Sequence, residues 1–162
     1  MIWSRFLHDE RGSPSVEFTL VLPIILPLIF ISMEAGNFFW SQQKLIQSVR
    51  DGARYAARLD YAKVCPTFDS AALDDVKNLT RSGSLKATAP SKLPGLTIED
   101  VTVTPSCTAF VNTGIYTGYG ANGAIVTVSV PKVRYRSLLG ALGVIDDSYN
   151  LAASAHSPVI GI

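Results

Sequence analysis

The sequence predicts an α+β protein in which one long N-terminal helix precedes a small antiparallel sheet. Three observations indicate this fold. Residues 18–33 are apolar and uncharged, residues 38–60 carry apolar side chains at helical spacing, and the C-terminal half contains runs that alternate as β-strands do. We expect the first half of the helix to span a membrane and the second half to pack on the sheet.

The apolar run needs additional residues to cross a bilayer. The hydrocarbon core requires about 20 helical residues at roughly 1.5 Å each. Extension to Trp40 supplies this length, although it takes in Glu34. We therefore expect a transmembrane helix over residues 13–40, preceded by a short polar leader at residues 1–12.

Two prolines, Pro23 and Pro27, lie inside the expected span. Each removes a backbone donor, which would break a helix in water but is tolerated in membrane helices. We expect a helix that is kinked or partly loosened around residues 22–28.

A cleaved secretory signal peptide is the alternative to a retained span. Such a peptide has a small-residue cleavage site after its apolar core. Here Glu34 and then bulky residues up to Trp40 follow the core, whereas the small residue Gly12 precedes it. The sequence therefore favours a helix that stays on the mature protein.

Two short segments carry a resemblance to known proteins. Gly12 is followed by SPSVEF and an apolar run, so that Glu17 is the fifth residue after the glycine. This resembles the cleavage signature of type IV-related prepilins, in which a peptidase cuts after the glycine and a glutamate is the fifth mature residue. The segment VEFTLVLP, together with QSVRDGARYAAR at 47–58, is similar to the TadE-like family, the minor pseudopilins of the tight-adherence (Tad, or Flp) pilus. The resemblance is specific over residues 11–59.

The resemblance implies a pilin-like fold and a place in a pilus assembly system. It implies cleavage by a prepilin peptidase between Gly12 and Ser13. It implies contacts with other pilin or pseudopilin subunits and with the inner-membrane assembly platform. It also implies a single-pass protein of the bacterial inner membrane, with a cytoplasmic leader and an extracytoplasmic domain at residues 61–162.

Glu17 is the residue on which the expected function depends. Placing a carboxylate at the edge of a membrane costs free energy, so such a residue usually has a function. The resemblance implies that Glu17 helps to dock one subunit against another subunit's new N-terminal amine, an attraction that a low dielectric strengthens. The alternative is a solvated acid that favours the positive end of the helix dipole.

Glu34 is a second acid, at the far end of the apolar run. We expect it to lie at the outer membrane interface beside Asn37 and Trp40, where aromatic rings favour the headgroup layer. The alternative is an intramembrane contact with a helix of a partner protein.

Residues 41–60 are expected to extend the helix as an amphipathic segment. The apolar stripe includes Val49 and Ala53, and Gly52 beside it allows another backbone to approach closely. Packing on the protein's own sheet is the expected arrangement, and docking on a neighbouring subunit is the alternative.

The only two cysteines are Cys65 and Cys107. Beyond the membrane, in an oxidising compartment, an even pair favours one disulfide over two free thiols. A zinc site needs more ligands than these cysteines and the distant His8 and His156 provide. We therefore expect no metal.

The outer domain shows one short helix and three strands. A helix is expected over residues 70–79, with Asp69 or Ser70 at its start, and strands over 97–104, 124–130 and 149–155. The loop at 112–123 contains GYGANG, but a β-run follows it, so we interpret Asn122-Gly123 as a hairpin turn and not as part of a dinucleotide-binding loop. No function is assigned to this loop.

Composition and motifs limit the function. A net charge of +1 argues against nucleic acid as the main partner. No nucleophile–base pair or paired-carboxylate site is present, so we expect neither an enzyme, nor a cofactor, nor a small-molecule substrate. The expected function is that of a minor pseudopilin. The alternative is a single-span, membrane-anchored extracytoplasmic binding module that is not incorporated in a pilus.

Overall fold

The structure, a computed structural model, describes residues 13–108, 123–140, 143 and 149–160. It contains the long helix α2 (Ser13–Ala57), the single-turn helix α3 (Tyr61–Val64) and the helix α4 (Ser70–Ser82). The strands are β1 (Thr102–Ser106), β2 (Ile125–Arg134) and β3 (Asn150–Pro158), which form one antiparallel sheet in the order β1-β2-β3. The predicted α+β fold, with a long N-terminal helix on a small antiparallel sheet, is confirmed. The leader with Gly12, and nearly all of the 112–123 loop, lie outside the described residues.

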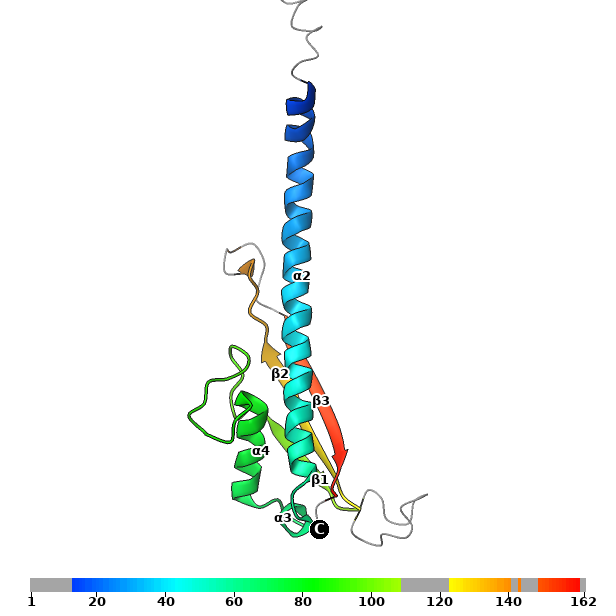
Figure 1. The fold of residues 1–162 in the computed structure, drawn as a ribbon, viewed down its shortest axis with the longest axis vertical. Helices are drawn as coiled ribbons and strands as arrows, with labels where there is room; N and C mark the ends of the chain where they lie inside the picture. The colour runs from blue at the N-terminus through cyan, green and yellow to red at the C-terminus, as the bar shows by residue number, and fades with distance from the viewer. Residues whose placement is uncertain (1–12, 109–122, 141–142, 144–148, 161–162) are drawn as a thin grey trace, which may run out of the picture.

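Helix α2 projects far beyond the rest of the molecule (Figure 1). It continues through Pro23 and Pro27 without a break, so the loosening expected around residues 22–28 is wrong. The two prolines lie one turn apart and therefore on one face, which leaves the hydrogen bonds on the other faces of the helix in place.

The second half of α2 covers one face of the sheet together with α4. Leu45, Val49 and Ala53 of α2 are buried against residues of β2 and α4. The members of this core that come from β2 and α4 are the valines Val76, Val126, Val128, Val130 and Val133. The expected packing of the amphipathic stripe on the protein's own sheet is therefore confirmed.

Within the described residues, helices cover only one face of the sheet. Every second residue of β2 from Val126 to Val130 is fully buried, whereas the residues between them are half-buried. On the open face Thr127 Oγ1 lies 2.8 Å from His156 Nδ1 on the neighbouring strand. This alternation is typical of an antiparallel sheet with one solvated side.

Helix α4 is bounded by the residues that sequence reasoning expects at such ends. The Asp69 side chain accepts a hydrogen bond from Ala72 N at 3.1 Å, so Asp69 is the N-cap. At the other end Gly83 has φ 78°, a left-handed conformation that glycine adopts without strain. The helix thus ends at Ser82 and not near Leu79, because the chain reverses only at this glycine.

The strands differ from their expected bounds for local reasons. β1 begins at Thr102 and not at Thr97, because Asp100 Oδ2 accepts hydrogen bonds from Thr97 N and Oγ1 and holds these residues in a turn. β2 extends past Pro131 through a shift in register between Val130 and Val133. A proline within a central strand is tolerated at such a bulge.

A disulfide joins the end of α3 to the segment after β1. Cys65 and Cys107 are bonded, with their Cα atoms 5.9 Å apart. The bridge closes a loop that contains α4, and closing a loop of this size constrains the unfolded chain.

Candidate membrane and assembly site

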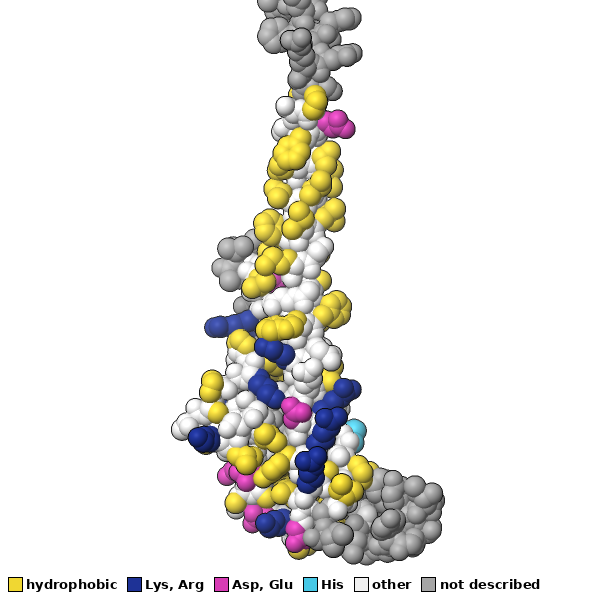
Figure 2. Space-filling view, viewed as in Figure 1, with side chains coloured by type: hydrophobic (Ala, Val, Ile, Leu, Met, Phe, Trp, Pro, Cys, Tyr) yellow, Lys and Arg dark blue, Asp and Glu magenta, His cyan; other side chains and the backbone are white. Residues whose placement is uncertain are grey.

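The first half of α2 is an apolar rod whose side chains are almost all exposed in the described part of the chain. Apart from Leu22, which is half-buried, the side chains of residues 14–33 are exposed. Figure 2 shows hydrophobic side chains over this part of α2, and Lys and Arg side chains gathered over the rest of the molecule. By length and composition α2 is the one helix of the described residues that is apolar enough to cross a membrane.

The free apolar segment matches a bilayer in length. Residues 14–33 span about 30 Å at roughly 1.5 Å per residue, which is the thickness of the hydrocarbon core. Among the described residues, the hydrogen bonds between α2 and the domain begin at Glu34. The last residues of the expected span, 34–40, therefore lie beside the domain's own polar groups.

Glu17 is the only charged residue within this segment. Its side chain is exposed on α2, and it makes no hydrogen bond or ion pair to the part of the chain that the structure describes. A carboxylate in an apolar setting favours a cationic partner. The described residues of this chain supply no such cationic partner.

Glu34, at the other end of the segment, is engaged within the chain. Its Oε2 accepts hydrogen bonds from the backbone N–H groups of Leu138 and Leu139, at 3.0 and 3.1 Å. The carboxylate thus fastens the loop after β2 to α2. Neither expectation for Glu34 included this contact, because nothing in the sequence links it to residues more than 100 positions later.

A polar cluster next to Glu34 strengthens the same junction. Asn37 Nδ2 donates to Tyr135 Oη at 2.7 Å, and Tyr135 Oη donates to the Glu34 carbonyl at 3.4 Å. The Phe38 ring packs edge-on against the Tyr135 ring, with centroids 5.2 Å apart. Burial, reinforced by the hydrogen bond to Glu34, raises the pKa of Tyr135 to about 12. Sequence reasoning singled out Asn37 only as a polar residue at the interface and missed Tyr135.

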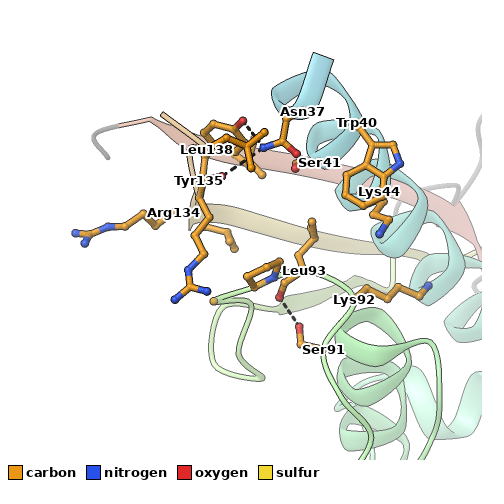
Figure 3. Close-up of a pocket in the computed structure, with 15 residues that line it drawn as sticks. Asn37, Trp40, Ser41, Lys44, Ser91, Lys92, Leu93, Arg134, Tyr135 and Leu138 are labelled. Carbon is orange, nitrogen blue, oxygen red and sulfur yellow. Dashed lines mark hydrogen bonds between the residues drawn. The ribbon is translucent and has the colours of Figure 1, made fainter. Parts of the chain in front are cut away.

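A cavity of about 510 Å³ lies on the domain side of this junction. Figure 3 shows that Trp40, Ser41 and Lys44 border it from α2, and Arg134 and Tyr135 from β2 and the residue after it. Lys44 Nζ lies 3.6 Å from the centre of the Trp40 ring. Within the described residues no group of three or more His, Cys, Asp or Glu side chains is placed to hold a metal ion.

These features define a class of protein: a small disulfide-linked α+β domain carried on one apolar helix, an architecture compatible with a single-pass membrane anchor. Residues 12–54 match the family described as TadE-like protein. The match covers α2 except its last turn, and it confirms the resemblance that the sequence suggests. Searches of the curated proteins and of the solved structures found no match to this chain.

Proposed function

We propose that this chain is a minor pseudopilin that takes part in assembly of a Tad (Flp) pilus. A prepilin peptidase would cut between Gly12 and Ser13 and leave α2 as the membrane anchor of the mature protein. The chain would then lie in the bacterial inner membrane with its domain outside the cytoplasm. The lack of a partner for Glu17 among the described residues, within an otherwise apolar segment, is the observation that supports this proposal most directly.

Glu17 and Glu34 differ in a way that separates their roles. Glu34 already has two backbone donors within the chain, so it needs no partner from another protein. Glu17 has none among the described residues. An N-terminal ammonium group released by cleavage is a cation that lies at the same depth in the membrane, about one helical turn away. We propose that the Glu17 carboxylate pairs with the N-terminal ammonium group of a neighbouring pilin or pseudopilin subunit. The inner-membrane platform would hold the two subunits together.

No catalytic role is part of the proposal. The competing function is that of a membrane-anchored binding module that never enters a pilus. It shares the helix and the domain but requires neither cleavage nor a partner for Glu17. Mass spectrometry of the protein from its native envelope separates the two, since the pseudopilin begins at Ser13 and the simple anchored module begins at Met1.

The first prediction concerns Glu17 itself. We expect Glu17→Ala to insert in the membrane at the wild-type level and to lose at least tenfold in pilus assembly, because the ammonium group loses its counter-charge. Glu99→Ala, an exposed acid of the outer domain, is the matched control and is expected to assemble normally. Assembled pili are measured in sheared fractions and membrane insertion in carbonate-washed membranes. Wild-type assembly of Glu17→Ala would contradict the proposed role.

A further inference from the structure

The cavity beside α2 has an apolar floor and a basic rim. Leu93 and Leu151 line it and are almost fully buried. Lys44 and Lys92 lie on one side of the cavity and Arg134 on the other (Figure 3). Arg136 also lines it. A hollow that combines apolar walls with several cations at its edge fits a ligand with an anionic head and an apolar body.

Three of the four cations have no acidic partner. Lys92 Nζ forms an ion pair with Asp51 at 3.1 Å. Lys44, Arg134 and Arg136 form no ion pair with the residues that the structure describes. Among the described residues, no aspartate or glutamate lines the cavity. The positive charge there is therefore not compensated by the described part of the chain.

The end of the cavity nearest the apolar segment lies at the depth of the lipid headgroups, and the rest of the cavity lies farther out. The helix residues that line it, 37–44, begin about 6 Å and end about 16 Å beyond Met33, at roughly 1.5 Å per residue. The headgroup region on each side of a bilayer is about 5–8 Å thick. Asn37 donates to the Arg136 carbonyl at 3.5 Å, which places the start of this arginine at the level of the headgroups. Trp40 is exposed just beyond this level.

We propose that this cavity binds the phosphate headgroup of an anionic phospholipid in the leaflet that faces the domain. Arg136, at the end nearest the membrane, supplies charge-assisted hydrogen bonds to the phosphate oxygens, and Arg134 and Lys44 add positive charge along the rim. The exposed side chain of Leu138 lies between the cavity and the apolar segment and offers contact to the acyl chains. The inference rests on the proposed insertion of α2 in a membrane, but it requires neither cleavage nor pilus assembly.

The test uses the full chain in neutral detergent micelles, titrated with phosphatidylglycerol or with phosphatidylcholine. Native mass spectrometry counts the bound lipid. We expect one tightly retained phosphatidylglycerol and a clear preference over phosphatidylcholine. Each lysine or arginine near an anionic lipid contributes roughly fivefold in affinity, so Lys44→Gln/Arg134→Gln/Arg136→Gln is expected to reduce binding about a hundredfold.

The matched control removes the same charge elsewhere on the molecule. Arg50→Gln/Arg54→Gln/Arg58→Gln changes three exposed arginines, two on α2 and one directly after it, that lie farther from the membrane, and it is expected to keep the preference. An equal loss in both triple variants would show diffuse attraction and would overturn the proposal. So would unchanged binding in the cavity variant, or displacement of the lipid by free glycerol phosphate. Failure of the wild-type chain to enter carbonate-resistant membranes would instead overturn the proposed anchor itself.

Discussion

Glu17 and Glu34 lie at opposite ends of the apolar segment, and their different surroundings predict different effects when they are mutated. Glu34 is bonded to the loop after β2, whereas Glu17 is exposed and has no partner among the described residues. A buried or partly buried donor that loses its acceptor costs about 1–3 kcal/mol. Changes at Glu34 are therefore expected to affect folding of the domain, and changes at Glu17 to affect assembly.

We predict that Glu34→Ala loosens the loop after β2 and lowers the free energy of unfolding by about 1–3 kcal/mol, because Leu138 N and Leu139 N lose their acceptor. Glu34→Gln keeps one side-chain oxygen as an acceptor and is expected to cost less. Trypsin cleavage after Arg136, which precedes the fastened residues, reports the loosening in detergent solution. Equal cleavage rates in wild type and Glu34→Ala would show that the carboxylate does not hold the loop.

Because of Tyr135, the stability of the junction between α2 and the segment after β2 is expected to depend on pH in the alkaline range. Its pKa is raised to about 12 in the folded protein, mainly by burial, against about 10 in the unfolded chain. The neutral phenol is thus favoured by folding, so this contribution is full below pH 10 and is lost as the pH rises towards 12. We predict that the difference in melting temperature between wild type and Tyr135→Phe narrows between pH 10 and pH 12. A constant difference in melting temperature between pH 10 and pH 12 would contradict this prediction.

At the scale of elements, α2 and α4 approach each other closely at Gly52. A Cβ atom on this glycine would overlap the Thr80 hydroxyl, and Val128 lies just beyond. Thr80 is fully buried, and its Oγ1 donates to the Val76 carbonyl at 2.8 Å, so it has little freedom to move. The glycine is therefore required by the approach of α4 and not by the conformation of α2.

We predict that Gly52→Ala lowers the free energy of unfolding by about 1–3 kcal/mol through overpacking, although alanine favours helices by about 1 kcal/mol. Gly36→Ala is the matched control on the same helix, since nothing lies within 4 Å of a Cβ there, and it is expected to be neutral or stabilising. Combining Gly52→Ala with Thr80→Ala should cost less than the sum of the two changes, because the overlap is removed. Strict additivity in thermal unfolding would argue against the contact.

The elements themselves could be predicted because their signals are local. Asp69 before an amphipathic run fixes the start of α4, and alternating valines mark β2. Periodicity at Val49 and Ala53 indicates the face of α2 that packs on the sheet. The start of β1 was missed because a turn formed around Asp100 competes with the strand for Thr97. Local hydrogen bonds of this kind are not visible in a hydrophobic pattern.

At the scale of the whole molecule, what the sequence did not predict is how the domain meets the membrane anchor. Glu34 and Tyr135 are far apart in the chain, and neither belongs to a motif that pairs them. The sequence predicted a span that reaches residue 40, whereas the domain already contacts α2 at Glu34. Hydrophobicity defines an apolar run, but the point at which a folded domain closes on it depends on tertiary contacts. The candidate cavity next to this point was missed for the same reason.

This geometry predicts a sharp change in exposure along α2. Gly36→Cys is expected to react with a membrane-impermeant maleimide on intact spheroplasts, because residue 36 lies just beyond the apolar segment and a side chain there meets no neighbouring atom. Ile29→Cys, which is also exposed on the isolated chain, is expected to react only after detergent is added, because lipid covers it. The native cysteines are joined in a disulfide and do not react. Labelling of Gly36→Cys only after permeabilisation would place the domain on the cytoplasmic side and would rule out an extracytoplasmic role. Labelling of both positions without detergent would show that α2 does not cross the membrane.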